Sequence, residues 1–302
     1  PVAILNQKLR LMFLKPHFHQ KKLLLVNTCA VVQIEKCHKG HIITMFIESL
    51  YTGYGQSFEV TEVLFELKTD FQQLVIFENP LLGRVMALDG IIQTTEKDEF
   101  IYHEMLTHVP LMSHPNPKKV LIIGGGDGGI LREVLKHTCV EQVTMVEIDP
   151  AVIDMAKQYF PNHSQGAFDH PKARVIIDDG VKFVNESTEY FDVIISDSTD
   201  PYGPAQALFS TDFYTAIASR LTEEGIFVAQ NGVPFFQLDE LKDTMQRFKP
   251  LFADHTCFTT TVPTYIGGVM TLAWGAKHLT SRLSSFSQLT SRPVVRGVIT
   301  RY

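Results

Sequence analysis

Short apolar runs alternate with helical segments from Lys119 onward, and this alternation constrains the fold more than any other feature. The runs are VLII (120–123), QVTMVEID (142–149), ARVIIDDG (173–180) and FDVIISDSTDP (191–201). Helix-forming segments such as AVIDMAKQYF (151–160) lie between them. Continuous apolar strands that alternate with helices predict a mostly parallel sheet wrapped by helices. Ligands of such sheets sit at the carboxyl ends of the strands, so the polar residues that close these runs are the candidate site.

The preceding segment has a different pattern. Between residues 62 and 96 the chain holds short runs rich in β-branched and aromatic residues, and polar, Gly or Pro residues separate them. This pattern predicts an antiparallel meander or a small barrel. Residues 98–112 follow as a predicted helix, and the proline-containing segment 113–119 is a predicted linker. We therefore expect a small β-rich domain over 46–116 and a Rossmann-like, methyltransferase-type α/β domain over 117–302.

Charge separates the first residues from the rest. The formal net charge of the chain is −6, but residues 1–45 carry seven Lys or Arg against the single acid Glu35. We expect 1–45 to be a basic N-terminal extension outside the fold. The acidic remainder argues against a nucleic-acid partner and permits a cationic one.

Cysteine usage and the apolar run at 21–34 bear on location. The four cysteines form no C-x-x-C pair, which favours a reducing compartment. The run at 21–34 is too short to span a bilayer and lacks a clean small-x-small cleavage site. We expect a cytoplasmic protein without a membrane partner.

The loop after the first run, GGGDGG (124–129), contains G-x-G-x-x-G between a predicted strand and a predicted helix. Glu147 closes the next run about 20 residues later, a spacing that suits a carboxylate on ribose hydroxyls. A pyrophosphate needs bare N–H groups at this position, and Asp127 would repel it. Asp127 would attract a cation, so the loop favours an adenosyl-sulfonium nucleoside over NAD.

Acids also close the third and fourth runs. Asp178 is placed to accept a hydrogen bond from an adenine amino group, whereas Asp179 fits the N-terminus of the next helix. Asp197 and Asp200 leave the fourth run together, immediately before Pro201. With Asp127 nearby they predict an anionic pocket that suits an amine.

The motifs GGGDGG, VEIDP, DDG and SDSTDP, in this order and spacing, resemble the polyamine aminopropyltransferases, with the bacterial type of spermidine synthase nearest. The upstream segment FENPLLGRVMALDGIIQTTEKDEFIYHEMLTHVPL is similar to the same family, and the likeness runs from roughly Glu48 to Trp274. The resemblance implies aminopropyl transfer from decarboxylated S-adenosylmethionine to putrescine (EC 2.5.1.16), which gives spermidine, methylthioadenosine and a proton. It also implies a homodimer or homotetramer, with the nucleoside as co-substrate and no further cofactor.

Residue roles follow where the motifs match. The resemblance implies a nucleoside site formed by Gln72, Gln93, His103, Gly124, Gly126, Asp127, Glu147, Asp178 and Gly180. It implies an amine site formed by Tyr102, Asp197, Asp200, Gln230 and Tyr265. Asp197 is the family's proposed base, and Tyr102 and Asp200 are implied to assist it.

Several alternatives stay open at this point. Taken without the resemblance, Tyr102 and His103 fit an ordinary amphipathic helix. Gln72 and Gln93 fit solvated strands, and Gln230 fits the cap of a strand end. A methyltransferase that uses S-adenosylmethionine and a non-catalytic binding protein on the same fold are the competing functions. Cadaverine, agmatine or spermidine are competing amines. A zinc protease is excluded, because His103 and His108 are five residues apart on a helix and point away from each other. Nothing else in the sequence indicates a metal, so none is expected. Compared with the family pattern, we expect the catalytic domain to be shortened at its C-terminus.

Overall fold

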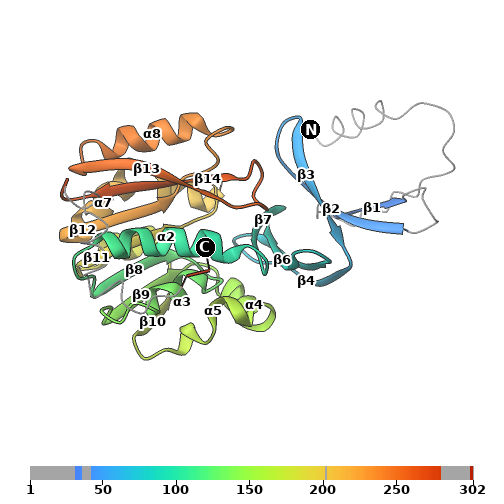
Figure 1. Cartoon of the computed structure of the whole chain (residues 1–302), viewed down its shortest axis with the longest axis horizontal. Coiled ribbons are helices and arrows are strands. Elements are labelled where there is room, and N and C mark those ends of the chain that lie inside the picture. The colour runs from blue at the N-terminus through green and yellow to red at the C-terminus, as the bar shows by residue number, and fades with distance from the viewer. Residues whose placement is uncertain (1–30, 36–41, 201–202, 280–299, 302) are drawn as a thin grey trace.

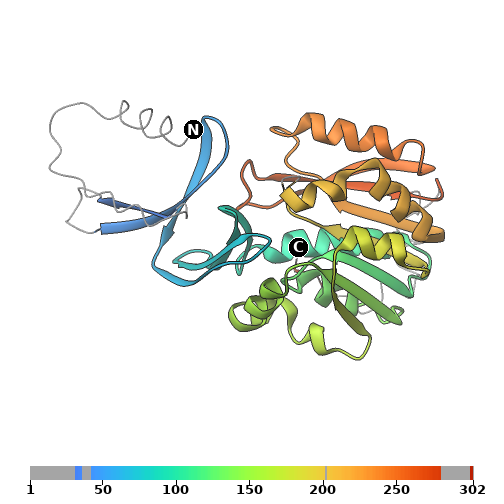
Figure 2. The same cartoon turned by 180° about the vertical axis from the view of Figure 1, so that it is seen from behind.

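The computed structural model describes residues 31–35, 42–200, 203–279 and 300–301, and these form a β-rich part and an α/β part (Figure 1). The expectations for residues 1–30 and for the C-terminal segment 280–299 lie outside the described residues. Seen from behind, the two parts meet along one side of the α/β part (Figure 2).

The β-rich part consists of two antiparallel sheets, which confirms the small antiparallel unit expected before the α/β domain. The first sheet contains β1 (Val31–Glu35), β2 (Ile42–Tyr51) and β3 (Tyr54–Val60). The second contains β4 (Glu62–Lys68), β5 (Gln73–Asn79), β6 (Gly83–Leu88) and β7 (Ile91–Thr95). Strand β2 crosses the boundary expected at 45/46 and pairs with β1, so strand structure extends into the segment assigned to the basic extension. The reason is that backbone pairing with β2 does not depend on the charge that set the boundary.

The α/β part is built on a seven-stranded sheet with the order β10-β9-β8-β11-β12-β14-β13. The strands from β10 to β12 in this order are parallel, and β14 is antiparallel to both of its neighbours. Their bounds are β8 (Lys119–Gly124), β9 (Gln142–Glu147), β10 (Ala173–Ile177), β11 (Phe191–Asp197), β12 (Leu221–Gln230), β13 (Asp254–Thr261) and β14 (Val269–Ala276). The Rossmann-like, methyltransferase-type fold expected from the alternating runs is confirmed.

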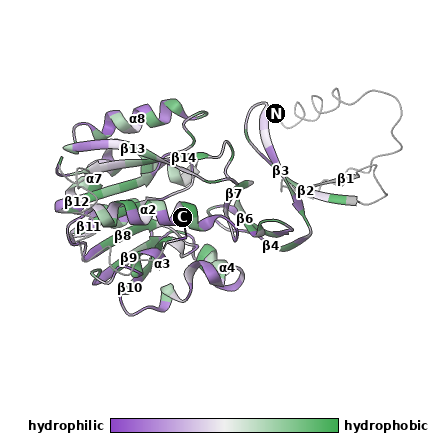
Figure 3. Cartoon of the chain, viewed as in Figure 1, coloured by the Kyte–Doolittle hydropathy of each residue, from purple (hydrophilic) through white to green (hydrophobic). Residues whose placement is uncertain are grey.

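Helices cover both faces of this sheet. They are α2 (Glu99–Ser113), α3 (Gly129–Leu135), α4 (Pro150–Tyr159), α5 (Pro161–Ser164), α6 (Gly180–Glu186), α7 (Thr211–Arg220) and α8 (Leu238–Phe248), with the 3₁₀ turns η1 (Ala167–Asp169) and η2 (Gly203–Phe209). Figure 3 shows hydrophilic and hydrophobic residues along α8, and only Thr244 and Phe248 of this helix are buried. In the described part of the chain, no helix combines the length and apolarity that a membrane crossing requires.

Helix α2 belongs with the α/β layers. Its side chains Tyr102, Leu106 and Leu111 join the same buried cluster as Val120 and Ile122 of β8. The expected boundary at 116/117 assigns this helix to the β-rich domain. The apolar face of α2 nevertheless packs on the sheet of the α/β part.

The first loop of the sheet is held against the neighbouring strand. Gly124 pairs with Asp197 at the carboxyl ends of β8 and β11, and its φ of +80° lies in the left-handed region. A Cβ atom at this position would collide with the backbone oxygen of Asp197. Only glycine therefore lets the two strand ends approach this closely.

We predict that Gly124→Ala destabilises the fold more than Gly166→Ala. Gly166 has nearly the same φ, +81°, but a Cβ there would meet no atom of the described residues within 4 Å. The Gly166 variant should lose about 1–2 kcal/mol of unfolding free energy, from backbone strain alone. The Gly124 variant should lose roughly a further 1–3 kcal/mol from the clash. Chemical-denaturation midpoints check this, and equal losses in both variants would contradict it.

Candidate active site

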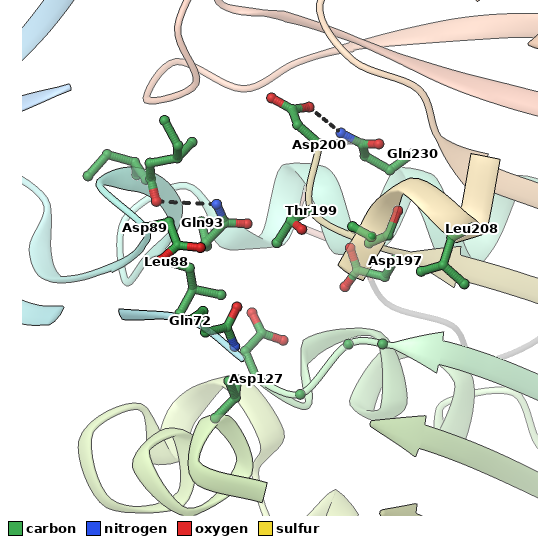
Figure 4. A pocket seen from close by; sticks show the side chains of 18 of the residues that line it. Gln72, Leu88, Asp89, Gln93, Asp127, Asp197, Thr199, Asp200, Leu208 and Gln230 are labelled. Carbon is green, nitrogen blue, oxygen red and sulfur yellow. Dashed lines mark hydrogen bonds between the residues drawn. The ribbon is translucent and has the colours of Figure 1, made fainter. Parts of the chain in front are cut away.

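A cavity opens at the carboxyl ends of β8, β9, β11 and β12, and residues of the β-rich part complete its wall (Figure 4). Nearly all of the side chains and glycines expected at the site line this one cavity. They are Gln72, Gln93, Tyr102, His103, Gly124, Gly126, Asp127, Glu147, Gly180, Asp197, Asp200, Gln230 and Tyr265. The exception is Asp178.

Glu147 lies at the end of β9, directly opposite the glycine loop. A Cβ on Gly126 would come within 2.9 Å of the Glu147 Oε2 atom, so the loop passes close over this carboxylate. The Oε1 atom accepts a hydrogen bond from the Asp149 backbone N–H at 2.9 Å. Burial raises the pKa of Glu147 to about 7. Its Oε2 atom faces the glycine loop at the cavity wall.

Two glutamines enter the cavity from the β-rich part. Gln72 donates from Nε2 to Asp149 Oδ2 at 3.0 Å, which ties its loop to the start of α4. The side chain of Gln93 donates to the Ile91 carbonyl at 3.2 Å, and the backbone carbonyl of Gln93 accepts from the Tyr265 hydroxyl at 2.7 Å. These contacts fix the two parts of the chain to each other at the cavity wall.

Asp178 lies at the surface beside the cavity. Its carboxylate accepts from Lys182 Nζ at 3.2 Å and from the Asp179 backbone N–H at 2.9 Å. Asp179 lines the cavity and caps α6, because its Oδ1 atom accepts from the Val181 N–H at 2.7 Å. The helix-terminal role expected for Asp179 is therefore observed, and Asp178 is turned toward Lys182 rather than toward the cavity.

Asp127 and His103 form a buried ion pair below the glycine loop. His103 Nε2 lies 3.1 Å from Asp127 Oδ2, and the Asp127 Oδ1 atom accepts from the Gly129 N–H at 2.8 Å. Burial alone would raise the pKa of Asp127, but the charge and hydrogen bond of His103, with smaller contributions from His163 and the Gly129 N–H, together hold this pKa far below its usual value. Asp127 is therefore a fixed negative charge.

Asp197 ends β11 beside the glycine loop, where it pairs with Gly124, and Asp200 follows in the next loop. The Tyr102 hydroxyl donates to Asp197 Oδ1 at 2.7 Å, and Gln230 Nε2 donates to Asp200 Oδ1 at 3.1 Å. Burial and the repulsion from Asp127 raise the pKa of Asp197 to about 6. The Oε1 atom of Gln230 is buried and has no hydrogen-bond partner among the described residues, so it is an acceptor available to a ligand N–H group.

The sequence analysis did not identify Glu48 and Gln237. Glu48 is 1% exposed on β2, accepts from Gln56 Nε2 at 2.6 Å and lines the cavity. Its burial raises its pKa to about 7. Gln237 also lines the cavity and bonds to Asp200. A lone acid within the apolar strand IESLY was the available signal for Glu48, whereas nothing in the sequence marks Gln237.

The charged side chains that line the cavity are nearly all acidic. Its acids are Glu48, Asp89, Asp127, Glu147, Asp179, Asp197 and Asp200, and no Lys or Arg is found among the described residues that line it. His103 is the one basic side chain of that set. Over the described part of the chain, no group of three or more His, Cys, Asp or Glu side chains has an arrangement that would hold a metal ion. The cavity is thus suited to organic cations.

Family models cover most of the chain. Residues 99–285 match the spermine/spermidine synthase domain, and residues 45–96 match the spermidine synthase tetramerisation domain. The polyamine aminopropyltransferase 1 of Pseudomonas aeruginosa is 58% identical over 255 residues, which is 84% of this chain and 89% of that protein. The polyamine aminopropyltransferase of Yersinia pestis is 54% identical over 258 residues, covering 85% of this chain and 87% of that protein.

Two solved structures of spermidine synthases have a similar fold. A spermidine synthase in complex with the transition state analogue AdoDATO matches with a TM-score of 0.77 and 43% identity, over 79% of this chain and 82% of that one. The spermidine synthase from Thermotoga maritima matches with a TM-score of 0.74 and 41% identity, over 79% of this chain and 81% of that one.

Proposed function

Because the chain belongs to the spermidine/spermine synthase family of polyamine aminopropyltransferases, we propose that it transfers the aminopropyl group of decarboxylated S-adenosylmethionine to putrescine. The products are spermidine, methylthioadenosine and a proton. The observation that carries this proposal is the buried, acid-lined cavity in which Asp127 and Asp197 face a common space. Both substrates are cations, and both would be drawn to such a cavity.

The nucleoside occupies the side of the cavity next to the glycine loop. Glu147 accepts hydrogen bonds from the ribose hydroxyls, and Asp127 holds the ammonium end of the aminopropyl chain. Gln72, Gln93 and His103 surround the nucleoside, and Gly124, Gly126 and Gly180 leave room for it. Asp178 lies at the adenine side, where its neighbours Asp179 and Gly180 line the cavity.

The diamine occupies the side next to Asp200. Asp200 and Gln230 hold its remote ammonium group, and the unpartnered Oε1 of Gln230 supports this placement. Tyr102 and Tyr265, whose ring centroids are 5.8 Å apart, flank the carbon chain. A buried ammonium group must pair its N–H donors, and the carboxylate of Asp200 and the side-chain oxygen of Gln230 accept from them.

Asp197 acts as the base. An alkylammonium has a pKa of roughly 10, so the amine must lose a proton before it attacks. The proton passes to the Asp197 carboxylate, directly or through Tyr102 or a water. The amine nitrogen then forms a bond to the methylene carbon on sulfur, and the carbon–sulfur electron pair leaves with the neutral thioether. Positioning and exclusion of water supply most of the rate.

The site selects decarboxylated over ordinary S-adenosylmethionine because the decarboxylated nucleoside lacks a carboxylate. The carboxylate of ordinary S-adenosylmethionine would approach Asp127 and Asp197 and be repelled. The chemistry needs no metal or organic cofactor, since the sulfonium already activates the carbon. The match of residues 45–96 to a tetramerisation domain supports a homodimer or homotetramer assembled through the β-rich part, and the thiol usage supports a cytoplasmic location.

A substrate panel tests this function. The purified protein is incubated with decarboxylated S-adenosylmethionine and, separately, putrescine, cadaverine, agmatine or spermidine. We expect methylthioadenosine release to be fastest with putrescine, with spermidine as the second product. Fastest release with another amine would overturn the acceptor assignment. Methyl transfer from S-adenosylmethionine without aminopropyl transfer would overturn the reaction itself.

The base assignment makes a separate prediction. Asp197→Asn should lower kcat by about 10²–10⁴-fold, because the amide cannot take the proton. Asp239→Asn is the control, since this aspartate is exposed on α8 and pairs with Lys242. In the unmodified enzyme kcat/KM should rise as pH passes upward through about 6, where Asp197 ionises. Normal turnover by the Asp197 variant, with methylthioadenosine binding intact, would refute the assignment.

A further inference from the structure

Glu99 lies outside the cavity but touches its basic residue. It is in the first turn of α2, 6% exposed, and its Oε2 atom is 2.7 Å from His103 Nδ1. The guanidinium of Arg132 on α3 holds the same oxygen at 2.9 Å, and Arg301 reaches Oε1 at 3.2 Å. Arg132 is itself fixed by Glu133 and by the carbonyl oxygen of His163. Glu99 is therefore a carboxylate with a defined position and a permanent charge.

His103 is held between two carboxylates. Its Nδ1 atom faces Glu99 and its Nε2 atom faces Asp127 at 3.1 Å. Since a carboxylate can only accept, both ring nitrogens carry a proton and the imidazole is a cation. Burial would lower the pKa of His103, but the two acids outweigh it and raise that pKa to about 10.

The other groups that contact His103 carry no negative charge that would keep its imidazole protonated. Tyr102 and His163 pack at its ring edges, with centroids 5.7 and 6.1 Å away. Burial lowers the pKa of His163, whose Nε2 atom bonds to the Thr94 hydroxyl at 2.9 Å. The interaction of Asp197 with His103 is an electrostatic attraction between their charges. Glu99 is thus the one contact of His103, among the described residues, that is negative and yet outside the cavity.

We propose that Glu99, anchored by Arg132, is a positioning residue that keeps His103 protonated against Asp127, so that Asp197 is ionised at neutral pH. The role of Asp197 in this statement rests on the proposed function. Without the imidazolium, Asp127 and Asp197 would be two buried like charges in one cavity, and one of them would retain a proton. The positive charge of His103 opposes the burial and repulsion that raise the pKa of Asp197.

The test compares Glu99→Gln with Glu104→Gln. Glu104 is 2% exposed on the same helix, but its Oε1 atom accepts from the Arg301 backbone N–H at 2.6 Å. In Glu99→Gln the acid limb of the kcat/KM profile should move upward by about one pH unit, and turnover should recover at higher pH. Glu104→Gln should leave the limb in place even if it destabilises the fold. An unmoved limb in Glu99→Gln would overturn the proposal.

A second readout does not depend on the reaction. A histidine whose pKa is raised by folding adds stability that is complete below its unfolded value and is lost as pH rises toward the folded value. For His103 this window runs from 6.5 to about 10. The difference in denaturation midpoint between the unmodified protein and Glu99→Gln should therefore be larger at pH 6 than at pH 10. A difference independent of pH would contradict the Glu99–His103 pairing, whereas failure of aminopropyl transfer alone would overturn only the proposed function.

Discussion

Two consecutive residues of helix α2 hold the two acids on which the cavity depends. His103 is 3.1 Å from Asp127, and the hydroxyl of Tyr102 donates to Asp197 at 2.7 Å. Two buried carboxylates in one cavity would otherwise share a proton or leave the cavity, because burial and mutual repulsion both disfavour the charged forms. One cation and one phenol therefore give the two acids different properties. Asp127 is a permanent anion, and Asp197 can exchange a proton near neutral pH.

The cavity also depends on contacts between the two parts of the chain. Tyr265 donates to the Gln93 carbonyl at 2.7 Å, and Asp98 Oδ2 accepts from the Thr264 N–H at 3.0 Å. Gln56 of β3 donates to the Thr264 carbonyl at 2.7 Å. These bonds connect segments more than 160 residues apart in the sequence, and they bring Glu48 into the wall. The β-rich part is thus a wall of the site as well as the segment that matches a tetramerisation domain.

The sequence predicts which site residues lie at the ends of strands. It does not predict the direction in which a side chain points. Asp127, Glu147 and Asp197 each lie at or just after the end of a parallel strand, so the order of the runs brought them to one edge. Asp178 is also at a strand end, but its neighbour Asp179 caps α6 and Asp178 turns to Lys182. Glu48 was missed because a lone acid within the strand IESLY fits a solvent-facing position as well as a buried one. The proline-containing linker marks the end of α2, but it carries no information about the sheet on which this helix packs.

The central claim is that the placement of these acids selects a nucleoside without a carboxylate. Isothermal titration calorimetry with decarboxylated and with ordinary S-adenosylmethionine tests it directly. Because the extra carboxylate would lie beside Asp127 and Asp197, the account predicts that the decarboxylated nucleoside binds more tightly, by at least about tenfold. Equal affinity, or tighter binding of ordinary S-adenosylmethionine, would contradict it.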